Sequence, residues 1–200
     1  MCHEGLLIVV SGPSGSGKGT VLNQLRGINQ RVRFSVSATT RKPREGEVEG
    51  VNYFFKTVEE FKRLIEDGEL IEWVEYCNNF YGTPRKHIEE ATKQGFDVIL
   101  EIEVEGAVNI KSKYPESVLV FILPPSFEEL RSRIVNRGTE NNDVIEQRLK
   151  RAKEELAYLS HYDYIIVNDE LSDAVDRLNS ILRSEKMRYS RNLDILNIYN

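Results

Sequence analysis

Short apolar runs alternate along the chain with longer stretches in which apolar residues recur at helical spacing. The runs are rich in Val, Ile, Leu and Phe, which is typical of buried strands, and each stretch between them is long enough for a crossover helix. This order predicts an α/β fold with a parallel core sheet flanked by helices. The predicted core strands are Leu6–Val10, Arg33–Ser37, Asp97–Ile102, Val118–Leu123 and Tyr164–Asn168.

Capping residues and glycines mark the expected helix ends. A Ser or Thr followed three residues later by Glu is a capping box, and a glycine in the left-handed conformation commonly ends a helix. The predicted starts are Thr57 with Glu60, Ser126 with Glu129, and Thr83-Pro84 as N-cap and first helical residue; the predicted stops are Gly68, Gly95, Gly138 and Pro115.

The stretch 38–91 interrupts the alternation of strands and helices. Tyr53–Phe55 and Leu70–Tyr76 predict strands, and Asn78-Asn79 predicts a turn, so we expect an inserted, mixed β/α lobe. A second irregular stretch, Asn136–Asp143, lies between two charged helices and is expected to form a mobile cover. The chain is then one domain with a core (1–37, 92–135 and 151–200), an inserted lobe (38–91) and a small helical lid (136–150).

Composition and charge narrow the class of protein. The chain has 200 residues, of which 40% are hydrophobic and 30% charged, as in one globular domain. A net charge of −5 would repel a nucleic-acid backbone, and the apolar runs are too short to cross a membrane. We therefore expect no nucleic-acid or membrane partner and a cytoplasmic location, with Cys2 and Cys77 as reduced thiols.

A glycine-rich segment, Gly12-Pro13-Ser14-Gly15-Ser16-Gly17-Lys18-Gly19-Thr20, joins the first strand to a helix expected to begin near Lys18. In this context the segment predicts a phosphate loop, in which backbone N–H groups and the helix N-terminus hold a polyphosphate. Lys18 would reach the β- and γ-phosphates. The position after the lysine, commonly Ser or Thr, is Gly19, so Thr20 is the candidate magnesium ligand, through a water molecule. The alternative is an ordinary glycine-rich turn with an exposed lysine.

Five cations without a carboxylate follow the first helix, in a chain that is acidic overall. Such a run forms either a solvated surface or an anion site. Its members are Arg31, Arg33, Arg41, Lys42 and Arg44.

From about Gly5 to Arg188, the chain carries ordered motifs that resemble the guanylate kinase family. The motifs are Ser35–Glu47 (SVSATTRKPREGE), Tyr53-Phe54-Phe55, Glu72-Trp73, Tyr81-Gly82-Thr83-Pro84, Ile122-Leu123-Pro124-Pro125-Ser126, Arg137-Gly138-Thr139 and Val167-Asn168-Asp169.

The resemblance implies a phosphate-loop NTPase fold that transfers the γ-phosphoryl group of ATP to GMP, giving ADP and GDP with Mg²⁺, in purine nucleotide metabolism. It implies ATP and GMP as small-molecule partners and a monomer or homodimer. Matched residue by residue, it assigns the acceptor phosphate to Ser37, Arg41, Arg44, Tyr53 and Tyr81, the guanine to Glu72 and Thr83, the lid to Arg133, Arg137 and Arg148, and the adenine side to Asn168, with Lys18, Arg41, Arg137 and Arg148 as the catalytic set.

Hydrogen bonding gives these assignments a physical basis. Arginines and phenols can give a phosphate dianion several charge-assisted bonds. A carboxylate at Glu72 can accept from N1 and N2 of guanine, and the Thr83 hydroxyl can donate to O6, whereas adenine offers an unprotonated N1. The alternatives are sheet packing for Tyr53 and Tyr81 and an outward-facing strand position for Glu72.

Glu101, Glu103 and Glu105 follow a buried run at intervals of two. Along a strand they would lie on one side, at the carboxyl edge where ligands bind in open α/β sheets, and we expect Glu101 and Glu103 to contribute to the GMP site. The alternative is the polar face of an edge strand. The family's usual segment resembles Glu-Ile-Asp-Val-Gln-Gly, so Glu103 replaces aspartate and Glu105 replaces glutamine, which adds negative charge near the phosphates.

The expected mechanism is in-line transfer without a covalent intermediate or a dedicated general base. Two rival functions remain at this point: a non-catalytic module that binds phosphorylated peptides, and a related kinase acting on another phosphorylated acceptor. The tail after Met187 is expected to dock on the core or at a subunit contact, or to fray.

Overall fold

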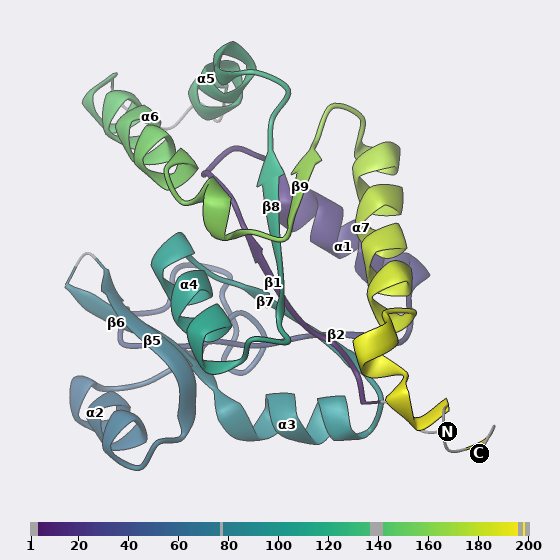
Figure 1. Ribbon diagram of the computed structural model, residues 1–200. Coiled ribbons are helices and arrows are strands. Elements are labelled where there is room, and N and C mark those ends of the chain that lie inside the picture. Colours follow the sequence, from purple (N-terminus) through teal and green to yellow (C-terminus); the bar gives the residue numbers. More distant parts are fainter. Residues whose placement is uncertain (1–3, 77, 137–141, 196–197, 199–200) are drawn as a thin grey trace.

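The computed structural model describes residues 4–76, 78–136, 142–195 and 198 (Figure 1). Its main sheet has five parallel strands in the order β2-β7-β1-β8-β9, which confirms the predicted α/β core. The strands are β1 (Leu7–Ser11), β2 (Val32–Phe34), β7 (Asp97–Glu101), β8 (Val118–Leu123) and β9 (Tyr164–Val167), and the covering helices are α1 (Lys18–Ile28), α3 (Arg85–Lys93), α4 (Val104–Lys113) and α7 (Leu171–Lys186).

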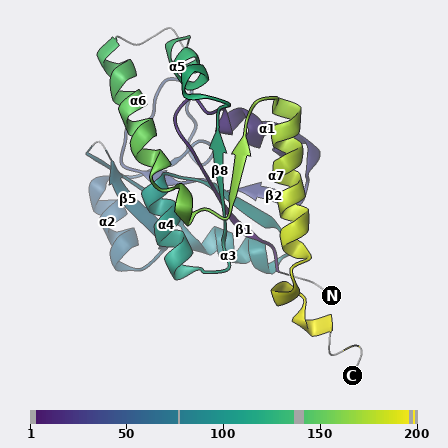
Figure 2. The same cartoon turned by 45° about the horizontal axis from the view of Figure 1, so that its top comes forward.

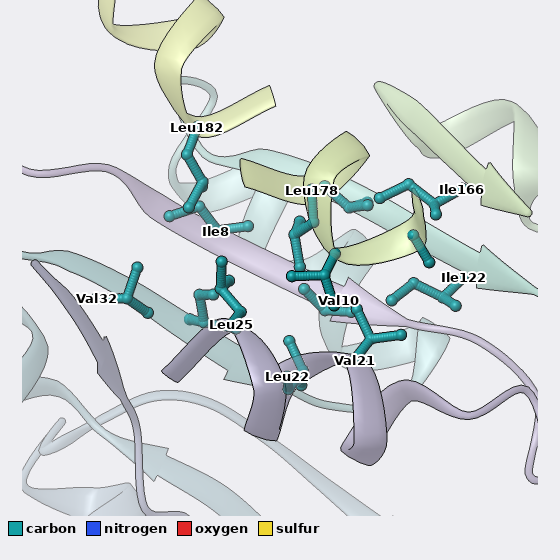
Figure 3. Packing of buried hydrophobic residues seen from close by; sticks show 14 of the residues in the cluster. Ile8, Val10, Val21, Leu22, Leu25, Val32, Ile122, Ile166, Leu178 and Leu182 are labelled. Atoms are coloured by element: carbon teal, nitrogen blue, oxygen red, sulfur yellow. The ribbon is translucent and has the colours of Figure 1, made fainter. Parts of the chain in front are cut away.

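Alternation along β1 divides the core between the two faces of the main sheet. Ile8 and Val10 face α1 and α7, where they pack with Leu25 and Leu178 (Figure 3). Val9 faces the other way, into a cluster supplied by α3 and α4. Because both faces are covered, β1 holds the loop that follows it in a rigid frame.

A second sheet of four strands lies beside the first, in the order β4-β3-β6-β5 (Figure 1). Its strands pair in both senses, since β5 and β6 are antiparallel whereas β3 and β4 are parallel. One helix, α2, covers this sheet with the fully buried Phe61. The elements are β3 (Ala38–Thr39), β4 (Phe54–Phe55), α2 (Val58–Glu66), β5 (Leu70–Tyr76) and β6 (Asn79–Pro84).

Two further helices, α5 (Phe127–Val135) and α6 (Asn142–Leu156), stand beyond the carboxyl end of β8 (Figure 2). They pack on each other through a small apolar cluster of their own, which includes Leu130 and Leu149. Among the helices of the described residues, none has the length and apolar character needed to cross a membrane.

Most predicted boundaries hold, and the differences have local causes. The strands Leu70–Tyr76 and Val118–Leu123 are confirmed, whereas the strand predicted to reach Ser37 ends at Phe34, because the chain leaves the main sheet there for β3. Two strands, β3 and β6, were not predicted. The turn after β5 contains Asn78 with φ 60°, and β6 already begins at Asn79.

The predicted helix caps have mixed outcomes. The capping box of Thr57 forms in both directions, but at Ser126 only the side-chain oxygen accepts, because the Glu129 carboxylate binds Arg133 instead. The N-cap prediction for Thr83-Pro84 is wrong, since both residues belong to β6 and α3 begins at Arg85. Left-handed Gly68 and Gly95 end their helices as predicted, as does the stop before Pro115; Gly138 lies outside the described residues.

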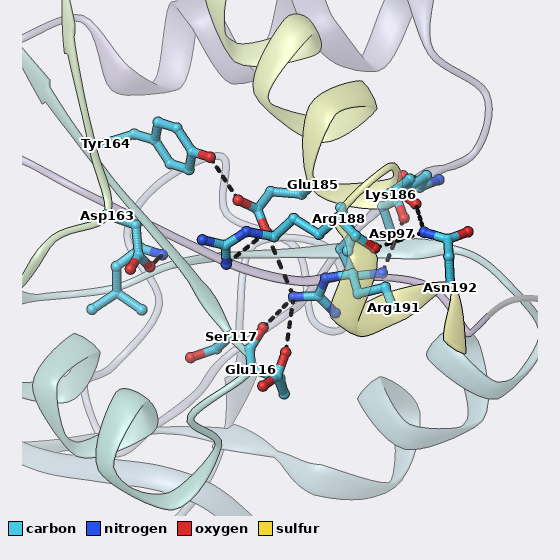
Figure 4. Close-up of polar contacts among 12 residues, drawn as sticks. Asp97, Glu116, Ser117, Asp163, Tyr164, Glu185, Lys186, Arg188, Arg191 and Asn192 are labelled. Carbon is cyan, nitrogen blue, oxygen red and sulfur yellow. Dashed lines mark hydrogen bonds and ion pairs between the residues drawn. The ribbon is translucent and has the colours of Figure 1, made fainter. Parts of the chain in front are cut away.

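The chain after α7 docks on the amino-terminal edge of the main sheet (Figure 4). The buried carboxylate of Glu185 accepts from the Tyr164 hydroxyl at 2.6 Å and lies 3.7 Å from Arg191. Arg191 also donates to the Glu116 carbonyl at 2.5 Å, and Asn192 donates to the last carbonyls of the helix region. Polar contacts of Arg191 and Asn192 therefore dock the turn η2 (Tyr189–Arg191) on the core. The chain continues in η3 (Leu193–Ile195), where Leu193 is exposed, as is Ile198 beyond it, so the expected docking through apolar side chains does not occur at these two residues.

Candidate functional site

The loop between β1 and α1 adopts a conformation that requires glycine. Gly12 and Gly17 have φ of 146° and 87°. A Cβ atom at Gly12 would lie 2.2 Å from the Ile122 carbonyl oxygen, and one at Gly17 would lie 2.3 Å from the Asn168 amide nitrogen. Only glycine lets the backbone pass this close to β8 and to the residue that follows β9, so the loop geometry fits the predicted phosphate loop.

The charge at this loop favours an anion. Helix α1 begins at Lys18, as predicted, and has no acidic residue in its first turn, so its N-terminal N–H groups and dipole face the loop without competition. The Lys18 ammonium folds back over the loop and donates to the Gly12 carbonyl and, at 3.3 Å, to the Pro13 carbonyl. Thr20 lies exposed in the same first turn, after Gly19.

Two predicted ATP-side residues support the loop. The buried Asn168 amide donates to the Ser16 carbonyl at 2.8 Å. Arg133 of α5 donates to the Asn168 carbonyl at 3.2 Å and is oriented by Glu129 at 2.7 Å. Both residues therefore hold the loop in place, a structural task that the sequence did not indicate.

One lid arginine reaches the same loop from α6. Nη1 of Arg148 lies 3.2 Å from the Ser14 hydroxyl. The predicted partner of Arg148 in the lid, Arg137, lies outside the described residues.

The predicted acceptor-phosphate residues gather around an aromatic pair on the four-stranded sheet. The rings of Tyr53 and Tyr81 meet edge to face with centroids 6.1 Å apart, and the Arg41 guanidinium lies 5.4 Å from the Tyr53 centroid. Ser37 accepts from the Phe54 amide through its carbonyl at 2.8 Å, next to the same pair. The arrangement brings a cation and two phenols together, as a phosphate site needs.

A carboxylate that the sequence analysis did not single out orients this cluster. Glu47 binds the Arg41 guanidinium at 2.8 Å and accepts from the Arg44 backbone N–H at 2.7 Å, and these contacts hold the pKa of Glu47 below its usual range. Arg44 itself is exposed. The sequence does offer one signal for Glu47: it lies three residues after Arg44, close enough to pair with the cationic run.

Glu72 and Thr83 face each other across β5 and β6, with their side chains buried. The Thr83 hydroxyl donates to Oε1 of Glu72 at 2.7 Å. Burial raises the pKa of Glu72 to about 7, while the Thr83 hydrogen bond and the charge of Lys113 work against that rise. The alternative outward-facing position belongs to the neighbouring Trp73, which is 41% exposed.

The three spaced glutamates do not share one strand face, so that prediction is wrong. Strand β7 ends at Glu101, Glu103 is the N-cap of α4, and Glu105 lies in the first helical turn. The helix begins there because Val104, Ala107 and Ile110 form its buried side. The edge-strand alternative is also wrong, since β7 lies between β2 and β1.

The two clusters nevertheless meet at the carboxyl edge of the main sheet. Glu101, the last residue of β7, pairs in register with Val10 of β1, and β1 ends one residue later, at Ser11, where the chain enters the phosphate loop. Burial raises the pKa of the Tyr53 phenol, and the charge of Glu101 is among the neighbours that add to this rise. Glu101 therefore lies beside the end of β1 that leads into the phosphate loop, and its charge also acts on Tyr53 of the acceptor cluster.

One cavity of the described residues lies away from these clusters. A cavity of about 360 Å³ sits between β2, β4 and α3, with Phe34, Phe54, His87 and Phe96 in its wall, and contains none of the predicted site residues. It lies where the chain passes from the five-stranded to the four-stranded sheet.

Comparison with known proteins identifies the family. The family model described as guanylate kinase matches residues 4–185. A guanylate kinase of Desulfitobacterium hafniense is 52% identical over 94% of this chain and 94% of its own length, and one of Shouchella clausii is 53% identical over 94% and 92%. The crystal structure of guanylate kinase from Anaplasma phagocytophilum superimposes with a TM-score of 0.78 at 39% identity, over 94% of this chain and 90% of that one.

Proposed function

The chain belongs to the guanylate kinase family, and we infer from its site how it carries out ATP-dependent phosphorylation of GMP. The observation that carries the proposal is the meeting of two anion-binding clusters at one sheet edge. Glu101 pairs in register with Val10, just before the phosphate loop over which Lys18 folds, and its charge acts on Tyr53, whose ring lies beside Arg41.

Phosphoryl transfer needs an acceptor oxygen in line with the γ-phosphorus and neutralisation of the charge on the equatorial oxygens. We propose that Lys18 and Arg148 neutralise the donor phosphates, since both reach the loop from different elements. Arg41, Arg44, Tyr53, Tyr81 and Ser37 hold the phosphate of GMP. The attacking oxygen is already ionised at neutral pH, so no side chain has to remove a proton.

Base selection rests on the buried pair Glu72 and Thr83. The carboxylate of Glu72 accepts from N1 and N2 of guanine, and the Thr83 hydroxyl turns from Glu72 to O6. Adenine would leave the carboxylate without donors, in a position that is 3% exposed and closed to compensating water. A site built on such hydrogen bonds discriminates by about 10⁴ or more.

The residues fit a magnesium ion held mainly by substrate. In the described ranges, no three His, Cys, Asp or Glu side chains gather into a metal site. Mg²⁺ commonly keeps several waters and binds substrate phosphates with few protein ligands. Thr20, exposed beside the loop, would hold it through water, and when bound the ion neutralises charge on the β- and γ-oxygens.

The inserted lobe (38–91) and the lid (136–150) are proposed to close over the two nucleotides. Closure excludes water, which would otherwise accept the phosphoryl group. The rival of a non-catalytic module finds no support in the donor loop, whose glycine geometry and lysine are intact.

A panel of nucleoside monophosphates tests this function directly. ADP formation from ATP is measured with GMP, AMP, CMP or UMP, with and without Mg²⁺. We expect rapid ADP formation with GMP and Mg²⁺ only. Equal rates with AMP, or a rate independent of the monophosphate, would contradict the assignment of Glu72 and Thr83.

A further inference from the structure

The guanidinium of Arg151 on α6 contacts groups from three elements. Its Nη2 atom lies 3.0 and 3.3 Å from the two carboxylate oxygens of Glu105 on α4. Its Nε atom lies 3.4 Å from Oε1 of Glu155, one turn along α6. The guanidinium carbon lies 5.4 Å from the ring centroid of Tyr76, the last residue of β5. Arg151 thus connects α6 to α4, which covers the main sheet, and to β5 of the four-stranded sheet.

From Tyr76, ring contacts continue into the acceptor-phosphate cluster. The centroids of Tyr76 and Tyr81 are 6.5 Å apart, and those of Tyr81 and Tyr53 are 6.1 Å apart. The last ring carries the Arg41 guanidinium at 5.4 Å. A continuous chain of contacts therefore runs from α6 to the arginine proposed to hold GMP.

The same helix touches the donor side. Arg148 precedes Arg151 by three residues, so both side chains leave the same side of α6. Arg148 contacts Ser14 of the phosphate loop at 3.2 Å. One rigid helix therefore reaches the donor loop with one arginine and the acceptor lobe with the next.

The charges around Arg151 indicate that its guanidinium holds α6 against α4. The side chain of Glu155 is 7% exposed, and its second carboxylate oxygen has no hydrogen-bond partner within the described residues. Burial raises the pKa of Glu155, the charge of Glu103 raises it further, and Lys18 lowers it. Without Arg151, both Glu105 and Glu155 would lose the guanidinium that binds them, and removing one partner of a buried ion pair is costly.

We propose that Arg151 is a positioning residue that couples the two nucleotide sites. It holds α6 against α4 and Tyr76, so that docking of the acceptor lobe around GMP fixes the helix that presents Arg148 to the donor phosphates. This proposal rests on the proposed function. Thermodynamic linkage requires that an occupied donor site raises the affinity for GMP by the same factor as GMP raises the affinity for the donor.

Calorimetric titration of GMP, with and without a saturating non-hydrolysable ATP analogue and Mg²⁺, measures this factor. For the unaltered protein we expect GMP to bind about 5-fold or more tightly with the analogue present, the lower end of ordinary coupling between sites. Arg151→Ala should reduce the factor to below about 2, while GMP affinity without the analogue changes little. Steady-state kinetics should show the same loss as a KM for GMP that no longer depends on ATP occupancy.

Substitutions at Tyr76 test the route independently of whether the Arg151 variant folds. Tyr76→Leu removes the ring face and should lose the coupling, whereas Tyr76→Phe keeps the face and should retain it. The matched control is Arg131→Ala, which removes an arginine of α5 from an exposed pair with Glu146 and should leave the factor unchanged.

Retention of the full factor in Arg151→Ala and Tyr76→Leu would overturn the proposal. So would a factor of one in the unaltered protein when both ligands bind, a result that leaves the proposed function standing. Failure of the unaltered protein to bind GMP at all would overturn both.

Discussion

At the scale of single residues, the proposed selectivity for guanine depends on one carboxylate, Glu72, that is buried. Glu72 is buried against Thr83 on one side and against Gly106 of α4 on the other, where a Cβ would lie 2.9 Å from Oε2. Burial makes its ionised form costly until a ligand brings donors. In the proposed binding mode guanine brings two donors, so the burial that destabilises the ionised carboxylate in the free protein favours binding of guanine.

The raised pKa of Glu72 predicts how GMP binding depends on pH. Because guanine donates to the ionised form and the pKa in the free protein is about 7, GMP affinity should fall about tenfold per unit as pH drops below 7 and level off above it. Titrations of GMP between pH 5.5 and 8.5 measure this. Glu72→Gln should flatten the profile, leaving only the titration of the GMP phosphate itself, and an unchanged profile would contradict the role of Glu72.

The effect of Glu72 on the free energy of unfolding has the opposite dependence on pH. Because its pKa in the folded state lies above the ordinary value of 4.5, Glu72 binds its proton more tightly there than in the unfolded chain. Its contribution therefore lowers the free energy of unfolding as pH rises from about 4.5 to 7. Glu72→Gln should remove this decline in urea unfolding of the ligand-free protein. A decline of the same size in the variant would assign it to another group.

Gly106→Ala should damage the acceptor site specifically. The added methyl group has to displace the Glu72 carboxylate, so we expect the KM for GMP to rise about tenfold or more, as for one lost charge-assisted hydrogen bond, with the KM for ATP unchanged. The matched control is Gly27→Ala in α1, where a Cβ meets nothing within 4 Å. If both variants leave the KM for GMP unchanged, Glu72 does not read the base in this position.

Lys18→Ala should reduce turnover with little effect on the fold. Removal of one preorganised donor at a transition state typically costs about 10²–10³ in kcat. Steady-state kinetics and circular dichroism measure the two effects, and near-normal turnover would reject the role of Lys18.

At the scale of elements, the sequence predicts strands and helices whose own residues show a regular apolar pattern. It does not predict strands that form only because segments far along the chain pair with them. β8 was predicted to the residue because its side chains are buried on both faces. The short β3 carries only Ala38 and Thr39, and exists because β4 and β6 pair with it from either side. At Thr83, local capping chemistry pointed to a helix, but the pairing with Glu72 in β5 outweighs it.

The docked tail yields a stability prediction at this scale. Arg191→Ala removes a mostly buried cation from Glu185, which is 1% exposed, and should lower the free energy of unfolding by about 1–3 kcal/mol. Arg188→Ala removes the exposed partner of the same carboxylate and should cost less, about 1 kcal/mol at most. Thermal unfolding measures both losses of stability, and kcat/KM should stay unchanged in both variants. Equal losses of stability would contradict the larger contribution expected of Arg191.

At the scale of the whole molecule, the two proposed nucleotide sites lie at one edge of the main sheet. The phosphate loop was predictable because its chemistry lies in nine consecutive residues, and the acceptor residues were named from the family resemblance. Arg151 and Glu155 were not found, because their role depends on Glu105 of another helix, and Glu47 was not found although its partners, Arg41 and Arg44, lie nearby in the chain. Asn168 and Arg133 were assigned to ATP, whereas their contacts also show that they support the loop.

The most direct test of the central claim follows the γ-phosphoryl group of labelled ATP when GMP and Mg²⁺ are present. If two nucleotides meet tail to tail in a closed site, the label should appear in GDP in a one-to-one ratio with ADP, with none on the protein and almost none as inorganic phosphate. Label accumulating mainly as inorganic phosphate, or attached to the protein, would contradict direct transfer between the phosphate loop and the Arg41 cluster.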